Sequence, residues 1–478
     1  MTPMTDGAAG GGDARISTRE AAARLGVKPE TLYAYVSRGL LGSRRAAGGR
    51  GSTFDPGEVA ALAARGRAAT STGSGAAQPS EPGSGSASCA DGWGRIRTGI
   101  TRIDTATGSY AFRGVDAVAL AEAYAYEEVA DWLWTGELRP GVRFTAPPLP
   151  LAAARAAAAA LPAGSSPVDR MRVAVVAAGA ADPLRFDLTR EAVLGCTRGL
   201  IPTLVDALPL AGGADRGDAA PDAPAAGGAG RGDRRDTGRI ARQPDAPAAG
   251  GAGGSGSVAR RLWSRLTPRE ADPASLRVLD TALALLIDHD LATSTLAVRV
   301  AASGRAHPYA AVSAGLGALD GPLHGQASAL AHRMLRDVLD QGGAGPVVAA
   351  HLRAGRRVPG LGHRLYRGED PRARLLLARL ADVPAAADAL AAAQDTVATA
   401  ARHTPLHANV DLALAVLSVA SGMPAEAGEA VFAVGRTAGW VAHALEEYAE
   451  PALRMRPSST YAGPPAPQPL PRPGTSPG

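Results

Sequence analysis

The chain has 478 residues and a formal net charge of only +5. A single hydrophobic core stops growing at roughly 250–300 residues, so this length predicts one large domain with smaller appendages. The 50 basic residues include a single lysine, Lys28. This bias indicates GC-rich coding more than function, so arginine richness alone does not indicate a nucleic-acid partner.

The sequence excludes several classes of protein. The two cysteines, Cys89 and Cys196, are far apart and form no metal-binding spacing, which favours a reducing compartment. Neither a signal sequence nor an apolar run of membrane length is present. We therefore expect a soluble cytoplasmic protein with no membrane partner.

Charge and histidine are distributed unevenly along the chain. Residues 14–67 carry ten basic and four acidic side chains, whereas the remainder is close to neutral. All nine histidines lie between His289 and His443. Chemistry that needs an imidazole is therefore expected in the C-terminal half.

The basic N-terminal segment, 14–67, has a helix-turn-helix pattern. Ser17 and Glu20 form a capping box that opens a short helix, Gly26 ends it, and Pro29 suits the first turn of a second helix. A wing in SRRAAGGRGSTF and a third helix in DPGEVAALAARGR follow. The pattern resembles the MerR or excisionase type of winged helix-turn-helix, which implies DNA as a partner. The implied contacts are Tyr33, Tyr35, Arg38, Arg44 and Arg45. The alternative is a small three-helix module that contacts protein or has no retained function.

Three segments of low complexity separate or end the folded parts. Residues 68–93 are rich in Ser, Gly and Pro and predict a flexible linker. Residues 211–257 contain PDAPAAGG twice and predict a disordered insertion that loops out of a closed domain. Residues 457–478 form a Pro-rich tail.

The remaining sequence, 94–456, is helical in pattern. Segments such as SLRVLDTALALLIDHDL and AGEAVFAVGRTAGWVAHALEEYAE repeat apolar residues every three or four positions, with breaks at Gly and Pro. Strand patterns are scarce, and only 97–113 predicts a small hairpin. We therefore expect a mostly α-helical domain.

Three motifs place polar side chains beside Gly or Pro. His324 lies in GPLHG, His363 in VPGLGHRLYRGEDPR and Asp411 in HANVD. Three longer segments accompany them in order: TGITRIDTATGSYAFRGVDAVALAEAYAYEEVADWLWTGEL, DHDLATSTLAVRVAAS, and GRTAGWVAHALEEY followed by RMRPSSTYAG. Across about 94–463 these segments resemble the citrate synthase family. The resemblance implies a large and a small helical domain, the small one spanning about 325–428, and a homodimer.

The implied reaction condenses acetyl-CoA with oxaloacetate and water to give citrate and free CoA. Removing a proton beside a thioester carbonyl requires a base and a donor to the oxygen that gains charge. By resemblance Asp411 is the base, His324 donates to the thioester oxygen, and His363 donates to the ketone oxygen of oxaloacetate. A neutral imidazole is suited to donate a hydrogen bond to the thioester oxygen. The glycines around His324 let the backbone approach the ligand.

The resemblance also assigns binding residues, and arginine suits a dicarboxylate because its guanidinium can hold a carboxylate with two hydrogen bonds. The implied contacts of oxaloacetate and the acetyl group are His289, Arg372, Arg436, Arg456 and Phe432. The implied CoA contacts are Pro359, Gly360, Leu361 and Gly362, with Arg356, Arg357 and Arg367 as candidates for its phosphates. Acetyl-CoA is then a co-substrate, and no permanently bound cofactor is expected.

The sequence departs from the family pattern at three positions. Ala292 stands where many relatives have Asn, and Gln326 and Ser328 replace Gly and Asn. Losing an amide that pairs with a buried group costs about 1–3 kcal/mol. These changes predict an altered substrate preference or weak activity, although no catalytic residue type is missing.

A metal site is the competing interpretation of part of this segment. His403, His407 and Asp411 are spaced four residues apart, which would align them on a continuous helix. Pro405 disrupts a helix interior, and no Cys or Glu motif completes the site. We therefore expect no metal.

Three functional classes remain open from sequence. The first is a condensing enzyme that makes citrate, or 2-methylcitrate from propionyl-CoA. The second is a DNA-binding regulator whose synthase-like domain senses a metabolite. The third is a catalytically weak partner that joins an active synthase as a heterodimer.

Overall fold

The computed structural model describes residues 15–25, 27, 32, 36, 41–45, 52–60, 62, 96–213, 256–321, 324–403, 405–457 and 460–464. The chain divides into two compact units, Met1–Cys89 and Ala90–Gly478. The predicted linker, 68–93, lies outside the described residues, as do most of the predicted insertion and the end of the tail.

The N-terminal unit contains a small antiparallel sheet and a helix. Strands β1 (Ile16–Ser17), β3 (Ser52–Phe54) and β2 (Ser43–Arg45) pair in that order, and α1 (Thr18–Leu25) follows β1. The Glu20 N–H donates to Ser17 Oγ, as the predicted cap requires. Arg44 and Arg45 lie on β2, in the predicted wing, whereas Tyr33, Tyr35 and Arg38 lie outside the described residues.

The second unit begins with a three-stranded antiparallel sheet. Strands β4 (Thr101–Asp104) and β5 (Ser109–Phe112) form the predicted hairpin, and β6 (Val115–Asp116) adds to the free edge of β5. Tyr110 and Phe112 of β5 are buried and join the main hydrophobic core. The hairpin prediction is confirmed, with one extra strand.

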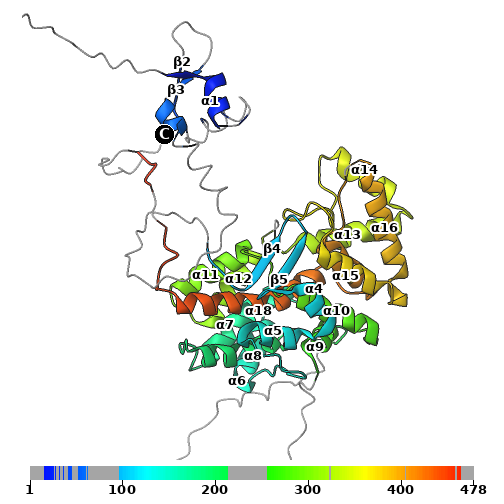
Figure 1. The fold of residues 1–478 in the computed structure, drawn as a ribbon. Helices are drawn as coiled ribbons and strands as arrows, with labels where there is room; N and C mark the ends of the chain where they lie inside the picture. Colours follow the sequence, from blue (N-terminus) through cyan, green and yellow to red (C-terminus); the bar gives the residue numbers. More distant parts are fainter. Residues whose placement is uncertain are drawn as a thin grey trace, which may run out of the picture. The chain divides into compact units, whose positions relative to one another are not determined.

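Helices make up most of the described residues of the second unit, as predicted (Figure 1). Their bounds are α4 Ala117–Ala123, α5 Tyr126–Thr135, α6 Pro148–Ala159, α7 Pro167–Ala181, α8 Arg190–Asp206, α9 Val258–Leu266, α10 Pro273–Leu285, α11 Thr293–Ser303, α12 Pro308–Leu319, α13 Ala327–Asp340, α14 Ala344–Arg353, α15 Pro371–Leu380, η1 Pro384–Ala386, α16 Ala387–Ala401, α17 Val410–Ala420 and α18 Ala427–Ala449. In the parts of the chain that the structure describes, no helix is both long and apolar enough to cross a lipid bilayer.

The helices of the second unit form two groups, one around α17 and one around α18. Figure 1 shows α13 to α16 together on one side, and α13, α15 and α16 also pack against α17. The longest helix, α18, runs through the other group and contacts α5, α7, α8, α10, α11 and α12. Its Gly439 lies against the Ile287 carbonyl, where a Cβ would clash, so α18 approaches the end of α10 closely.

Candidate active site

His289 and His363 lie together, although 74 positions separate them in the sequence. His289 lies in the loop after α10 and His363 in the loop between α14 and α15, and their ring centroids are 5.2 Å apart. Tyr366 contacts both: its hydroxyl is 2.7 Å from His289 Nε2, and its ring centroid is 4.8 Å from that of His363. The predicted pair is therefore joined by a tyrosine that the sequence analysis did not assign.

Arg372 extends this cluster from the start of α15. Its guanidinium donates to both carboxylate oxygens of Asp370, at 2.9 and 2.8 Å, and both side chains are almost fully buried. Asp370 also accepts from the Val410 N–H at 3.1 Å, which links α15 to the first turn of α17. Asp411 is the next residue, so this bond holds the predicted base near Arg372.

His324 forms a second half of the site with α18. Its Nε2 is 2.8 Å from Ser294 Oγ, and its ring is nearly perpendicular to that of Phe432, with the centroids 5.7 Å apart. The Arg436 guanidinium carbon lies over the Phe432 ring, 4.6 Å from the ring centroid. Arg436 donates from Nε to the Leu286 carbonyl, and its buried Nη1 has no partner among the described residues.

Burial and nearby positive charge set the protonation of the histidines. Burial lowers the pKa of His324 to about 4, with a further contribution from Arg436. Burial likewise lowers the pKa of His363 to about 4, assisted by Arg372. The pKa of His289 falls well below its usual value, because it is buried and feels Arg372, Arg436 and His363. All three rings are neutral at pH 7, and Arg436 lowers the pKa of both His289 and His324.

The predicted base has the opposite shift. Burial raises the pKa of Asp411 to about 6, while Arg372 lowers it and Asp370 raises it. Asp411 is the second residue of α17, whose cap is Asn409: the Asn409 Oδ1 accepts from the Asp411 N–H at 3.0 Å. A carboxylate with a raised pKa is suited to removing a weakly acidic proton.

The loop 358–363 has an unusual backbone. Gly360 and Gly362 adopt φ angles of +78° and +80°, which favour glycine. The Gly362 N–H donates to the His407 carbonyl, and the Asn409 N–H and side chain bond Gly360 O and Gly362 O. This loop borders a cavity of about 810 Å³ that Arg356, Arg357 and Arg364 also line.

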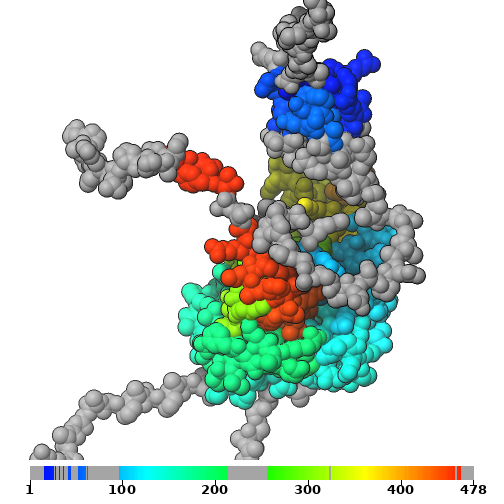
Figure 2. Space-filling model, turned by 60° about the vertical axis from the view of Figure 1, so that its left-hand side comes forward, coloured from blue at the N-terminus to red at the C-terminus, as the bar shows by residue number. Residues whose placement is uncertain are grey.

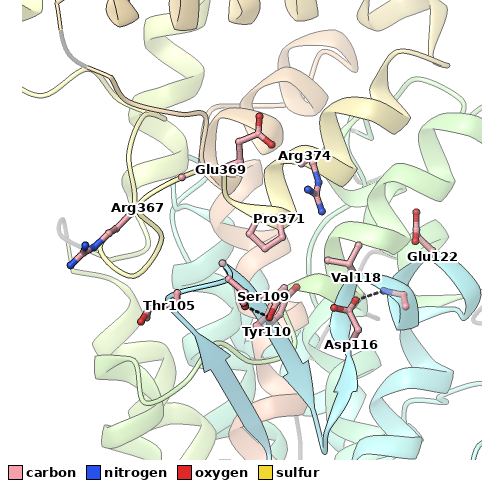
Figure 3. A pocket seen from close by; sticks show the side chains of 15 residues that line it. Thr105, Ser109, Tyr110, Asp116, Val118, Glu122, Arg367, Glu369, Pro371 and Arg374 are labelled. Atoms are coloured by element: carbon pink, nitrogen blue, oxygen red, sulfur yellow. Dashed lines mark hydrogen bonds between the residues drawn. The ribbon is translucent and has the colours of Figure 1, made fainter. Parts of the chain in front are cut away.

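The structure separates Arg367 from the other proposed CoA arginines. Arg367 lines a different cavity of about 790 Å³, between the β4–β5 turn and the start of α15 (Figure 3). Figure 3 shows Arg374 pointing from α15 toward Val118 and Asp116. Arg364, which the sequence analysis did not assign, takes the place beside Arg356 instead.

Arg456 also lies apart from the cluster. It follows the turn after α18, is exposed, and has no side-chain hydrogen bond or ion pair within the described part of the chain. Figure 2 shows the end of α18 and the residues after it (red-orange) at the surface of the second unit. A single chain therefore does not bring Arg456 to the other predicted site residues.

The three departures from the family pattern have ordinary surroundings. Ala292 is the N-cap of α11 and provides no side-chain hydrogen bond there. Gln326 donates to the Asp320 carbonyl at 3.4 Å, and Ser328 is buried against Gly428. None of these contacts involves His324 or Asp411.

The alternative metal stripe is not continuous. Helix α16 ends at Ala401 and α17 begins at Val410, so His403 and His407 lie between helices, as Pro405 predicted. Across the ranges that the structure describes, no group of three His, Cys, Asp or Glu side chains is placed to hold a metal.

Several residues of the site were not among those predicted from sequence. Asp370 and Asn409 are helix caps, so an Asp before Pro and an Asn before an apolar run were available signals. Ser294 and Tyr366 carry no local signal, because only the tertiary fold brings them to His324 and His289.

The chain is similar in sequence to citrate synthases. The family model described as "Citrate synthase, C-terminal domain" matches residues 90–458. The citrate synthase of Haloferax volcanii is 36% identical over 203 residues, and that of Acidithiobacillus ferridurans is 31% identical over 206. Each match covers 41% of this chain and 53% of the relative, so the chain spans about half the length of these curated relatives.

Solved structures show the same fold. Citrate synthase from Thermotoga maritima superposes with a TM-score of 0.57 at 24% identity, covering 80% of this chain and 96% of that one. A ternary complex of the Thermoplasma acidophilum citrate synthase with carboxymethyl coenzyme A and oxaloacetate gives 0.59 at 22% identity, covering 79% and 96%.

Proposed function

The chain belongs to the citrate synthase family, and from this premise we propose that it condenses acetyl-CoA with oxaloacetate and water to give citrate and free CoA. The observation that carries the proposal is the meeting of neutral His289 and His363 with Arg372, beside a carboxylate, Asp411, whose pKa is raised to about 6.

The hydrogen bonds of His363 define what its role as a donor requires. The Leu365 N–H lies 3.1 Å from His363 Nδ1, and Arg372 Nη2 lies 3.2 Å from Nε2, so both ring nitrogens face groups that can only donate. His363 would donate to the ketone oxygen of oxaloacetate with its ring proton on Nε2. This requires Arg372 Nη2 to turn from Nε2 to a carboxylate of the substrate.

His324 and Asp411 would act on the acetyl group. Ser294 lies at His324 Nε2, which leaves Nδ1 to face a thioester oxygen. Asp411 would remove the methyl proton while His324 donates to the oxygen that gains charge. The carbon nucleophile then attacks the ketone carbon of oxaloacetate, and water releases CoA from the resulting thioester.

The cavity beside loop 358–363 is proposed as the CoA site. Its arginines Arg356, Arg357 and Arg364 match the charge of phosphates, and Pro359 to Gly362 would face the adenine. We propose that the helices α13 to α17 form a small domain of about 325–428, which moves to close the site. Arg367, which lines a different cavity, could reach the CoA phosphates only after this movement. Closure would exclude water during carbon–carbon bond formation.

A homodimer is part of the proposal. Exposed apolar side chains lie on α6, α7 and the loop after α7, at Leu149, Val176, Leu184 and Phe186. Such side chains favour burial against a second copy. A dimer would also allow the exposed Arg456 to reach oxaloacetate in the partner's site. We also propose a cytoplasmic location, for which the unpaired Cys196 is suited.

The test is release of CoA by the purified full chain with oxaloacetate and either acetyl-CoA or propionyl-CoA. We expect turnover with acetyl-CoA, and faster turnover with propionyl-CoA would favour 2-methylcitrate. Asp411→Asn should lower kcat by about 100- to 10,000-fold while retaining oxaloacetate binding. Wild type without turnover that forms a heterodimer with an active synthase would favour the third class.

The N-terminal unit supports a second proposal, DNA binding. The observation that favours it is the β2–β3 pair, which carries Arg44 and Arg45 where a winged helix-turn-helix contacts phosphates. We expect binding to a DNA duplex that weakens with salt, and loss of this binding in Arg45→Ala. Binding that responds to oxaloacetate, without turnover, would favour a regulator.

A further inference from the structure

A buried carboxylate directly precedes one of the proposed substrate histidines. Asp288 has no exposed surface, and its Oδ2 accepts hydrogen bonds from Thr101 Oγ1 at 2.5 Å and His443 Nε2 at 3.1 Å. Thr101 belongs to β4 and His443 to α18, while Asp288 follows α10. Three elements therefore meet at one oxygen, one residue before His289.

The other ring nitrogen of His443 fixes its tautomer. Nδ1 lies 2.9 Å from Arg299 Nη1, and a guanidinium can only donate. Nδ1 is thus the acceptor, and the ring proton lies on Nε2, where it donates to Asp288. Arg299 is itself held by Glu446 at 2.6 Å and Glu447 at 3.2 Å.

The same segment is held to α18 at a second point. Arg436 Nε donates to the Leu286 carbonyl at 2.8 Å. Arg436 and His443 are seven residues apart in α18 and therefore share a face of the helix. The chain from Leu286 to Asp288, which positions His289, is fastened at both ends by the helix that carries a proposed substrate arginine.

Asp288 also acts on that arginine through charge. Burial alone would raise the Asp288 pKa, but its contacts with His443 and the charge of Arg436 hold it below the usual value. Burial lowers the pKa of Arg436 to about 10, and Asp288 opposes this shift. The ionised carboxylate therefore supports the charged form of Arg436.

We propose that Asp288 is a positioning residue of the oxaloacetate site, held by His443 and Arg299, which fixes His289 and Arg436 in the geometry that binds the substrate. The inference rests on the proposed function, because it acts through residues assigned to oxaloacetate. Asp288 itself touches neither substrate.

The test compares variants of the full chain by calorimetric titration with oxaloacetate and by KM for each substrate. Asp288→Asn should raise the oxaloacetate Kd by about tenfold, with little change in KM for acetyl-CoA. His443→Leu should raise the oxaloacetate Kd by a similar factor. The double variant Asp288→Asn, His443→Leu should raise it no further, because the two residues act as a unit. His443→Gln, whose amide can donate to Asp288, should recover most of the affinity.

Asp280→Asn is the matched control, since Asp280 is a partly buried carboxylate of α10, the helix that Asp288 follows, and its Oδ2 accepts from the Tyr126 N–H. Its oxaloacetate Kd should equal that of wild type, and an equal loss there would overturn the inference. A folded Asp288→Asn that binds oxaloacetate like wild type would also overturn it, while leaving the proposed function intact. Wild type that binds no oxaloacetate would instead refute the proposed function.

Thr101→Val tests the role of Asp288 if Asp288→Asn does not fold. It removes one of the two bonds to Asp288 Oδ2 and should still weaken oxaloacetate binding, again without changing KM for acetyl-CoA. An unchanged Kd in this variant would overturn the inference.

Discussion

Burial is the largest influence on the protonation of Asp411, His324 and His363. It disfavours charge on every one of them, so the carboxyl becomes a stronger base and the imidazoles stay neutral. The same residue types on the surface would have ordinary pKa values. The chemistry proposed for this site therefore depends on its enclosure as much as on the residues themselves.

These pKa shifts predict a pH profile. Because protonated Asp411 cannot accept a proton, kcat/KM should fall as the pH drops below about 6. His324 and His363, with pKa values of about 4, remain neutral throughout this range. Steady-state CoA release between pH 5 and 9 would measure this fall, and a kcat/KM that stays constant down to pH 5 would contradict the assignment to Asp411.

The shift at Asp411 also predicts an effect on stability. Its pKa is 3.8 when unperturbed and about 6 in the folded chain, so the folded state binds the proton more tightly than the unfolded state. Stability from this group is therefore lost as the pH rises between these values. Asp411→Asn should raise Tm at pH 7.5 but not at pH 3.5, as measured by calorimetry. A lower Tm at pH 7.5 would contradict this expectation.

At the scale of elements, the close approach of α18 to the end of α10 organises the site. Both Gly435 and Gly439 of α18 face backbone of residues 283–287, so no side chain separates the two helices there. The approach places Phe432 and Arg436 next to the loop that carries His289. The helices α15 and α17 contribute to the site through their caps, Asp370 and Asn409.

Gly439→Ala tests this packing. The added Cβ would clash with the Ile287 carbonyl, so we expect a loss of about 1–3 kcal/mol in the free energy of unfolding. Gly317→Ala is the matched control, because Gly317 is exposed in α12 with open space at its Cβ position. It should change stability by less than about 1 kcal/mol, toward greater stability. Denaturant unfolding measures both, and equal effects would show that the close approach is unimportant.

At the scale of the whole molecule, the segment between α8 and α9 is anchored at both ends. Arg261 of α9 donates from Nε to Asp206 of α8 at 3.0 Å, and the Ala211 N–H donates to the Ser264 carbonyl. Contacts between residues of α8 and α9 and the chain next to them therefore join the two helices, and none of these contacts involves residues 214–255. This arrangement is suited to a domain that closes around an insertion.

Replacing residues 214–255 by a short Gly/Ser linker should therefore leave Tm and turnover nearly unchanged. Thermal unfolding and CoA release by the shortened chain would measure this. Arg261→Ala in the shortened chain should lower Tm, because it leaves the buried carboxylate of Asp206 with only the more distant Arg265, at 4.0 Å, as an ion-pair partner. A folded shortened chain without turnover would place the insertion at the active site instead.

The helical class, the hairpin near 97–113, the family and the break between α16 and α17 could all be predicted from the amino-acid sequence. Each of these depends on local periodicity, on Gly and Pro, or on motifs along the chain. Four features became visible in the folded chain alone: Tyr366 contacts His289, Asp288 contacts His443, Arg364 and not Arg367 lines the cavity with Arg356, and Arg456 lies apart. Such contacts join residues from distant elements, and their partners are chosen by packing, which no single stretch of sequence encodes.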